Sequence, residues 1–476
     1  MSVEAGDKTC DILISNGLVF DGTGAPGVRI DVAIQNDRIV GLGALKDWVA
    51  REKINAQGMA VAPGFIDAHT HDDLALIEHP EMRYKVCQGV STVVVGNCGL
   101  SPAPIGPRQE DVAPFTIFRG GKTPSLDSPR YPNFASYLND IKLAQPWVHA
   151  VTLVGHLTCR AAVMDRFDRA ANNEEICAMQ ALVDEAMTAG ADGFSTGLAY
   201  PPGLAAPIEE VIALAEVAGR HKGIYCTHMR DEGLGLLGSI DETLTVGKLA
   251  KIPVVISHHK CSGRASWGLS KQSLLKIDSA ARDQLYPVHL DVYPYTASST
   301  GLMADWIDDA DRIIITGSEP HPELAGLDLA DIADDWECTL IEAIERLHPA
   351  RAIYFKMDEA DLERILAHPL CMIGSDGLPG DSHPHPRLWG TFPRILGRYV
   401  RERKIIDLAT AVHKMTGLTA KVFGLSGRGV LAVGNCADVV IFDPDTVIDK
   451  ATYEKPKSLP VGIKKVIIGG QIRIDG

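Results

Sequence analysis

Two histidines separated by one residue, His69 and His71, end the mainly apolar run 59–67. On a β-strand alternate side chains share a face, so both imidazoles would point the same way and Thr70 the opposite way. Two imidazoles at the end of a buried strand can bind a metal ion at the mouth of a barrel. Ordinary strand-end histidines also show this spacing, so its meaning depends on the rest of the chain.

Other side chains that could bind a metal ion also follow apolar runs. Cys98 comes just past one such run, and His228 and His258 end two others. A lone cysteine is more often a buried structural residue, but a thiolate at a strand end binds Zn²⁺ well and can bridge two ions. Together with His69 and His71, these side chains would supply the ligands of a metal centre.

Strand alternation predicts which neighbours of these candidates face the site and which face away from it. His259 would face away from His258 and pack outside the site, whereas Lys260 shares the face of His258 and could contact a substrate. His156 follows the run 148–155. Because a lone strand-end histidine is often only hydrogen-bonded, we expect His156 to support the site from behind.

Asp376 ends the eighth apolar run and would face the same mouth as the histidines. Ser-Asp-Gly is also a good turn sequence, but the seven other polar strand ends favour an acid-base role for this carboxylate. Nearby, Arg387 could clamp a substrate carboxylate in bidentate fashion. Tyr293 and Ser299 could add hydrogen bonds.

These residue types together predict metal-assisted hydrolysis of an amide. Zn²⁺ with three protein ligands keeps a position for water and lowers the pKa of that water to about 7. The resulting hydroxide would attack the carbonyl, and the metal would stabilise the oxyanion. Asp376 would take a proton from the water and deliver it to the leaving amine, a role worth about 10²–10⁴-fold in rate.

The elements that must position these residues are strands that alternate with helical segments such as 172–190 and 208–223. This alternation predicts a parallel sheet, and eight strands predict a (β/α)₈ barrel with its site at the C-terminal strand ends. The expected strands are 60–71, 91–99, 148–156, 191–200, 223–230, 253–260, 286–295 and 371–377.

Short strands with Gly and Asn-Asp turns also occupy both ends of the chain, and their pattern favours antiparallel pairing. Neither end suffices for an independent sandwich. We therefore expect 1–62 and 416–476 to build one small β-domain around a barrel of 63–415. Two connections, 102–148 and 298–370, are long enough to be functional, and we expect the second to cover the barrel mouth, with a peripheral decoration as the alternative.

The composition of the 476 residues narrows the classes of partner and location. A formal net charge of -15 disfavours nucleic acid and anionic membranes as partners. The chain shows no signal peptide and no apolar run of membrane-spanning length, and its ten cysteines are scattered. We expect a cytoplasmic protein with reduced cysteines, either a monomer or a small homo-oligomer.

With these motifs in view, the chain resembles the metal-dependent amidohydrolase superfamily, and within it the N-acyl-D-amino-acid deacylase (D-aminoacylase) branch. The resemblance covers nearly the whole chain. It is carried by residues 63–73, 94–104, 195–203, 227–232, 257–263, 291–300, 373–402 and 414–446.

The resemblance implies a (β/α)₈ barrel with a small β-domain, and a role for each matching residue. Cys98, His228 and His258 would hold a tightly bound Zn²⁺. His69 and His71, with Cys98 bridging, would form a second, weaker metal position. Asp376 would be the general acid-base of N-acyl-D-amino acid hydrolysis. The substrate α-carboxylate would be bound by Lys260, Tyr293, Ser299 and Arg387.

Two alternatives remain at this point. Cyclic-amide (hydantoinase-type) enzymes of the superfamily use a carboxylated lysine after the fourth strand, and the stretch 191–200 has none; a D-peptide hydrolase would share the scaffold. A non-catalytic scaffold protein should have lost ligands, and a chain that binds no zinc would favour that alternative. Neither the D side chain, acidic or hydrophobic, nor the acyl group follows from the sequence, and Arg230 and Arg264 are loop residues of a kind that is more often solvated.

Overall fold

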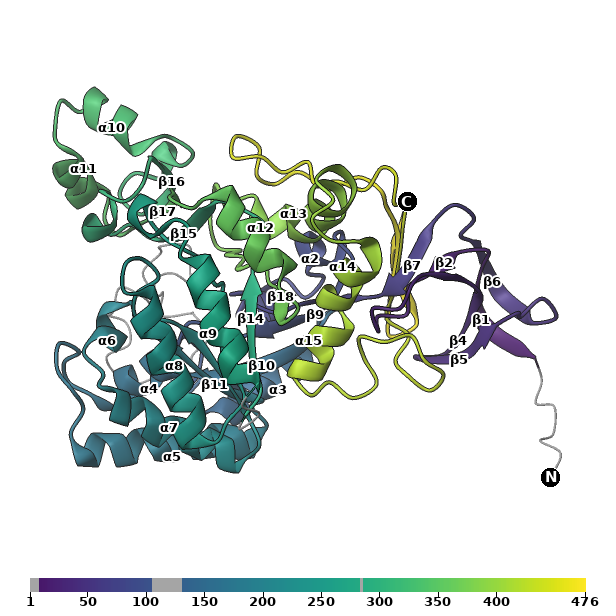
Figure 1. Ribbon diagram of the computed structural model, residues 1–476, viewed down its shortest axis with the longest axis horizontal. Coiled ribbons are helices and arrows are strands. Elements are labelled where there is room, and N and C mark those ends of the chain that lie inside the picture. The colour runs from purple at the N-terminus through teal and green to yellow at the C-terminus, as the bar shows by residue number, and fades with distance from the viewer. Residues whose placement is uncertain (1–7, 105–130, 283–285) are drawn as a thin grey trace.

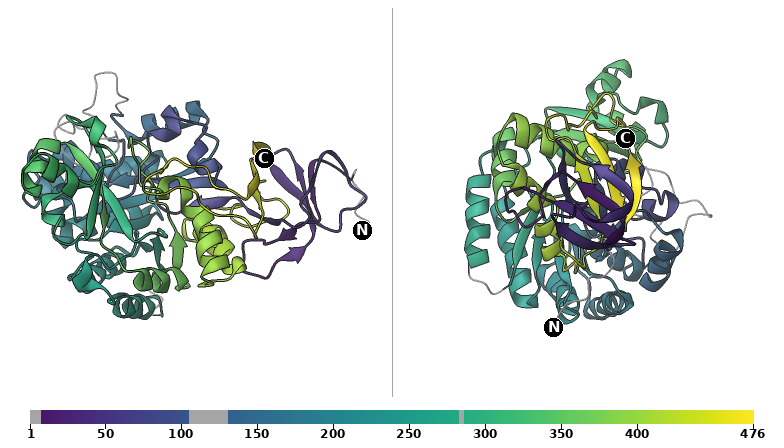
Figure 2. Two further views of the ribbon diagram at one scale, coloured as in Figure 1. Left: turned by 90° about the horizontal axis from the view of Figure 1, so that it is seen from above. Right: turned by 90° about the vertical axis from the view of Figure 1, so that its right-hand side faces the viewer.

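The computed structural model describes residues 8–104, 131–282 and 286–476. A barrel with its helices forms the larger part of an elongated molecule, and a smaller β-unit with both chain ends lies to one side (Figure 1). A third group of elements, inserted near the end of the barrel, lies on the side remote from the two termini (Figures 1 and 2).

Eight parallel strands form the barrel in the order in which they occur in the chain, which confirms the predicted fold. They are β8 (Phe65–Asp67), β9 (Val90–Val95), β10 (His149–Gly155), β11 (Gly193–Gly197), β12 (Ile224–His228), β13 (Val254–Ile256), β14 (Val288–Val292) and β18 (Cys371–Ile373). The ring closes just past β8 and β18, where the Ala68 amide donates to the Ile373 carbonyl at 3.1 Å and the His71 amide to the Gly377 carbonyl at 3.0 Å.

The first expected strand, 60–71, is wrong as a single element. Its first part, β7 (Ala60–Pro63), pairs with a strand from the C-terminal end of the chain, and only β8 belongs to the barrel. Gly64 lies between the two, and a side chain at this position would collide with Ser91 of β9. His69 and His71 therefore lie past the strand end.

Helices follow the barrel strands, and most of them cover the outside of the barrel. They are α1 (Ala75–Glu78), α2 (Arg83–Val86), α3 (Phe134–Ala144), α4 (His156–Val163), α5 (Asn173–Ala189), α6 (Pro201–Leu204), α7 (Ile208–Arg220), α8 (Leu236–Ala250), η3 (Arg264–Ser266), α9 (Ser270–Arg282), α12 (Glu359–Ala367), α13 (Arg387–Arg394), the π-helix η6 (Ile395–Glu402), α14 (Leu408–Met415) and α15 (Gly417–Val422). Local sequence explains the boundaries of α5, which begins with a capping box of Asn172 and Glu175 and ends at Gly190 with φ of 118°. In α7, Val211, Leu214 and Ala218 are buried at helical spacing.

Two sheets form the small β-unit, and strands from both chain ends share the second sheet. The first contains β1 (Thr9–Ser15), β4 (Asp31–Gln35), β5 (Arg38–Gly43) and β6 (Val49–Asn55). The second contains β2 (Leu18–Val19), β3 (Val28–Arg29), β7, β19 (Val439–Phe442), β20 (Ile463–Ile468) and β21 (Gln471–Asp475). Ile12 and Ile34 of the first sheet pack with Val439 and Ile467 of the second, as in a sandwich.

Antiparallel pairing was the expectation for this unit, and it is wrong for two pairs, β1 with β6 and β2 with β7, which run parallel. The expected boundaries between the small β-domain and the barrel, at 62/63 and 415/416, stay predictions. The helix α15 follows the second of these boundaries and packs against β18 of the barrel.

The insertion after β14 has a three-stranded sheet and a core of its own. It comprises β15 (Ala297–Gly301), η4 (Ala304–Trp306), β16 (Arg312–Ser318), η5 (Pro322–Leu324), α10 (Leu329–Asp335), α11 (Leu340–Leu347) and β17 (Ala350–Phe355). Leu302, Ile313, Leu347 and Tyr354 are buried together in that core. Of the other long connection, 105–130 lies outside the described residues.

Among the helices in the described part of the chain, none combines the length and the apolar character that crossing a bilayer requires.

Candidate metal centre and active site

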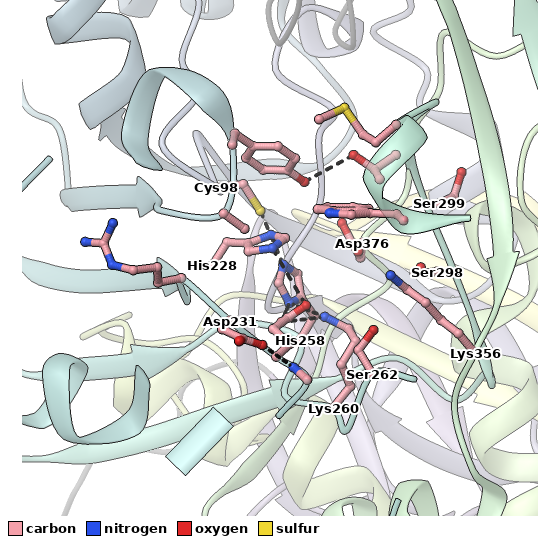
Figure 3. Close-up of a pocket in the computed structure, with 18 of the residues that line it drawn as sticks. Cys98, His228, Asp231, His258, Lys260, Ser262, Ser298, Ser299, Lys356 and Asp376 are labelled. Carbon is pink, nitrogen blue, oxygen red and sulfur yellow. Dashed lines mark hydrogen bonds and ion pairs between the residues drawn. The ribbon is translucent and has the colours of Figure 1, made fainter. Parts of the chain in front are cut away.

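A cavity of about 560 Å³ opens at the C-terminal ends of the barrel strands (Figure 3). Strand-end residues form its floor, and residues of the insertion, including Trp306 and Lys356, form part of its wall. The inserted segment therefore contributes directly to the mouth of the barrel. Eight of the predicted site residues line the cavity: His71, Cys98, His228, His258, Lys260, Tyr293, Ser299 and Asp376.

Three of the predicted ligands, Cys98, His228 and His258, converge on the floor of this cavity. Each is buried, and their donor atoms lie within 4.8 Å of one another. The Cys98 Sγ lies 3.4 Å from His258 Nε2, and the two imidazole rings are 4.5 Å apart. The strand ends of β9, β12 and β13 thus bring together side chains that are up to 160 residues apart in the chain.

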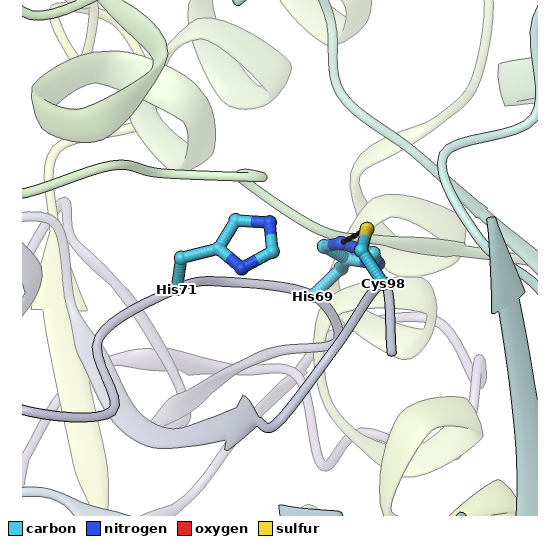
Figure 4. Close-up of side chains that lie close together, drawn as sticks. All are labelled: His69, His71 and Cys98. Carbon is cyan, nitrogen blue, oxygen red and sulfur yellow. Dashed lines mark hydrogen bonds between the residues drawn. The ribbon is translucent and has the colours of Figure 1, made fainter. Parts of the chain in front are cut away.

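The histidine pair forms a second group with Cys98, in which the donor atoms lie within 4.8 Å of one another (Figure 4). His69 Nε2 lies 3.4 Å from Cys98 Sγ, and His71 Nε2 lies 3.1 Å from an Asp376 carboxylate oxygen. The two donor groups therefore share the thiol, as a bridging ligand would require.

The backbone at this site is strained. Cys98, His258 and Asp376 all have positive φ, at 54°, 36° and 50°. Such conformations are uncommon for residues other than glycine and concentrate at functional sites. Two residues before Cys98, Gly96 also has a positive φ of 80°, and a Cβ at this position would collide with the Leu153 carbonyl of β10.

The donor set fits a divalent metal ion such as Zn²⁺. In tetrahedral zinc sites the bond lengths place a sulfur and a nitrogen ligand about 3.6 Å apart. The two Sγ–Nε2 distances of 3.4 Å are close to that value. Burial would lower the pKa of His69, but Cys98 and Asp291 raise this pKa to about 9, so the centre favours positive charge. A metal ion would bring that charge in place of the protons.

The electrostatics also favour a thiolate and a carboxylate. Burial would raise the pKa of the Cys98 thiol, but His69, His258 and His228 together lower this pKa well below its ordinary value. Burial would likewise raise the pKa of Asp376, and Arg387, His71 and the other nearby histidines lower it well below the ordinary value. Both shifts favour the anionic form, a thiolate for Cys98 and a carboxylate for Asp376.

Arg387 sits directly behind Asp376. Its Nη1 lies 3.0 Å from Asp376 Oδ2, its Nη2 donates to the Ser299 carbonyl at 3.0 Å, and its guanidinium lies 4.6 Å from the centre of the Tyr293 ring. Tyr293 and Ser299 line the cavity, whereas Arg387 is fully buried beneath its wall. The structure thus brings the predicted carboxylate-binding residues together beside Asp376.

Glu232 is a site residue that the sequence analysis missed. One of its carboxylate oxygens accepts from Lys260 Nζ at 2.6 Å and lies 3.0 Å from His258 Nδ1, and the other lies 3.7 Å from His228 Nε2. A carboxylate behind a ligating histidine fixes the orientation and tautomer of its ring. The only signal in the sequence was its place four residues after His228.

A buried ion network behind the histidine pair was also missed. Lys85 of α2 donates to Asp67 at 2.7 Å, to Ser375 at 2.6 Å and to Thr70 at 3.0 Å. Asp67 ends β8 and Ser375 follows β18, so the network joins the loop that carries His69 and His71 to the loop that carries Asp376. Lys85 lies on the short helix α2, and nothing in the local sequence pattern indicated its role.

Four other candidates lie outside the metal-binding cluster. His259 Nε2 contacts Ser273 Oγ on α9 at 2.8 Å, away from the cavity, and His156 Nε2 contacts Glu210 at 2.8 Å. Arg230 lies in the cavity wall and pairs with Glu242 at 2.7 Å. Arg264 is paired with Asp311 at 2.8 Å, outside the cavity lining.

Comparison with known proteins agrees with this geometry. Residues 52–261 and 329–474 match the Amidohydrolase family. The chain is 47% identical to a D-aminoacylase of Alcaligenes xylosoxydans xylosoxydans, over 98% of this chain and 95% of that protein. It is 46% identical to an N-acyl-D-glutamate deacylase of the same organism, over 97% and 93%.

Solved structures give the same result. The N-acyl-D-glutamate deacylase of Bordetella bronchiseptica, complexed with zinc and a phosphonate inhibitor, superposes with a TM-score of 0.94 at 45% identity, over 98% of this chain and 96% of that one. An L-hydantoinase of Arthrobacter aurescens has a TM-score of 0.62 at 15% identity, over 98% and 96%, and shares the fold alone.

Fold and site together define a (β/α)₈ barrel enzyme with cysteine and histidine side chains that could hold a metal ion at the C-terminal ends of its strands. The chain belongs to the amidohydrolase family.

Proposed function

We propose that this protein hydrolyses the amide bond of N-acyl-D-amino acids, giving a carboxylate and a free D-amino acid. The observation that carries the proposal is the convergence of two metal-ligand groups on Cys98 with Asp376 against them. The relatives at 46–47% identity are named for this activity on D-amino acid derivatives.

Zn²⁺ is the metal that the donor set fits best, because thiolate and imidazole are its preferred ligands. Cys98, His228 and His258 would hold the tighter ion, since Glu232 contacts His258 Nδ1 at 3.0 Å and places a negative charge 3.7 Å from His228 Nε2. His69 and His71, with the shared thiolate, would hold a weaker one. When bound, the metal supplies Lewis acidity and an activated water.

Asp376 moves the protons of the reaction. It is a carboxylate at neutral pH, and at 8% exposure it faces the cavity from beside the histidine pair. It can accept a proton from the attacking water and return it to the leaving amine, which is a poor leaving group unless protonated.

The α-carboxylate of the substrate would bind between Lys260, Tyr293, Ser299 and Arg387. Lys260 and Tyr293 face the cavity, with the ammonium 5.7 Å from the ring centre, and Arg387 backs the same wall. Anchoring the carboxylate here would place the scissile amide next to Asp376 and the ligand cluster. A hydantoin, which is cyclic and lacks a free carboxylate, would make little use of these contacts.

An assay of metal-loaded protein on N-acetyl-D-amino acids, their L enantiomers and hydantoins tests this function. We expect hydrolysis of the D-compounds only. Activity confined to hydantoins or to L-compounds would refute the proposal. The expectations that the protein binds neither nucleic acid nor anionic membranes, and that it is a monomer or a small homo-oligomer, stay predictions.

A further inference from the structure

Lys356 is a cavity-lining cation that none of the steps above uses. It directly follows β17 of the insertion, and its side chain is 9% exposed (Figure 3). The ammonium lies 4.5 Å from the centre of the Trp306 ring and 5.3 Å from that of Tyr354. These aromatic faces limit where the ammonium can move and keep it at the cavity wall.

The other cations of the cavity are each matched by an acid. Arg387 pairs with Asp376 at 3.0 Å, Lys260 with Glu232 at 2.6 Å and Arg230 with Glu242 at 2.7 Å. Lys356 makes no ion pair within 4.0 Å to any residue that the structure describes. A largely buried charge without a partner is costly, so this position favours an anionic ligand.

The position of Lys356 indicates which part of a substrate it would reach. Its strand, β17, pairs directly with β15, where Ser299 lies opposite Ile353. Lys356 therefore belongs to the same wall as Ser299, one of the residues assigned to the α-carboxylate. The apolar lining of Leu100, Pro201 and Leu204 comes from the loop after β9 and from α6, and it suits an acyl chain.

We infer that Lys356 binds a second carboxylate, on the side chain of the substrate, so that N-acyl derivatives of D-glutamate and D-aspartate are the preferred class. The inference rests on the proposed function. The exposed acids Asp305 and Asp309 lie at the rim of the cavity, where water and salt screen them, and do not neutralise the buried ammonium.

Protonation of Lys356 is compatible with this role at neutral pH. Burial lowers the pKa of Lys356, Lys260 lowers it too, and Glu232 and Asp309 raise it, with a net value of about 8. The ammonium form therefore predominates below pH 8 and is lost above it.

The test compares kcat/KM for N-acetyl-D-glutamate with that for N-acetyl-D-glutamine, which is nearly isosteric and neutral. A charge-assisted hydrogen bond predicts a preference of about 10- to 100-fold for the glutamate compound. Lys356→Met should bring the ratio close to one and leave the rate on the glutamine compound within about threefold. Lys356→Arg should restore much of the preference, and Lys271→Met, at an exposed position, should change nothing.

Three results would overturn the inference. The first is a native enzyme that hydrolyses N-acetyl-D-glutamine or N-acetyl-D-methionine as well as N-acetyl-D-glutamate. The second is a Lys356→Met variant that loses the same fraction of activity on all substrates, which would indicate a structural role. The third is a preference for N-succinyl- over N-acetyl-D-leucine that Lys356→Met removes, which would place the second carboxylate on the acyl side.

A pH profile separates charge from shape. The glutamate-to-glutamine ratio of kcat/KM should decline as the pH rises through about 8, where the free enzyme loses the Lys356 ammonium. A constant ratio up to pH 10 would contradict the inference. If no N-acyl-D-amino acid is hydrolysed at all, the proposed function itself fails, and the inference falls with it.

Discussion

The two metal-ligand groups share Cys98 but differ in what supports their histidines. Behind His228 and His258 lies a single carboxylate, Glu232, in a loop that borders the cavity. His69 also has a carboxylate near its ring, since Asp291 lies 3.7 Å from its Nδ1, but this is longer than the 3.0 Å between Glu232 and His258 Nδ1. The loop of His69 and His71 is in addition tied to the core by the fully buried Lys85 network. The His228 and His258 group is therefore influenced mainly by a charge at the cavity edge. The His69 and His71 group is held in place mainly by the contacts that close the barrel.

This difference bears on the order of metal affinity and on the division of roles. A carboxylate that contacts the ring nitrogen of a ligand increases its basicity and strengthens the metal bond. His71 instead faces Asp376, which the reaction needs as a proton carrier. The His228 and His258 group is thus built for affinity, and the His69 and His71 group positions the proton carrier.

Replacing the shared ligand should have the largest effect. Cys98→Ser removes the thiolate from both groups, so we expect loss of all tightly bound metal. Activity should fall by about 10³-fold or more, because the Lewis-acid contribution of several kcal/mol is lost with the metal. Metal content by mass spectrometry and a deacylase assay measure both effects. Retention of one full equivalent of metal would contradict the sharing of Cys98.

Removing one histidine from each group tests the comparison directly. His258→Ala should lose the tight metal and with it the activity, whereas His69→Ala should keep about one equivalent, since it leaves Cys98, His228 and His258 in place. Zinc content after dialysis distinguishes the two variants. The reverse result, with metal in His258→Ala and none in His69→Ala, would make the histidine pair the primary site.

Asp376→Asn should separate proton transfer from metal binding. The amide cannot carry the proton, so kcat should drop by about 10²–10⁴-fold while the tight metal stays bound. The matched control is Asp305→Asn, a carboxylate at the exposed rim of the same cavity. A variant that loses metal in proportion to activity would show that Asp376 acts as a ligand instead.

What the sequence could predict depends on how local the signal is. Strand alternation and position at strand ends are local, so the eight barrel strands and the converging His, Cys and Asp residues could be predicted from the chain alone. Lys85 and Lys356 come from a short helix and from the insertion, and they meet the site only through tertiary packing. The close approach of Ser91 to Gly64, between β7 and β8, is likewise a tertiary contact that no local pattern records.

Glu232→Gln should have the smallest effect of the series. The substitution keeps the size of the side chain but removes the charge that contacts His258 and pairs with Lys260. Loss of such a supporting carboxylate typically weakens metal binding by about 10- to 100-fold. Zinc affinity measured by competition with a chelator should show this loss in the native background. In His69→Ala, where the other histidine group is already disrupted, the same loss should appear, because Glu232 acts on the His228 and His258 group alone. A Glu232 substitution that left zinc affinity unchanged but released the weaker metal would reverse the assignment of tight and weak positions.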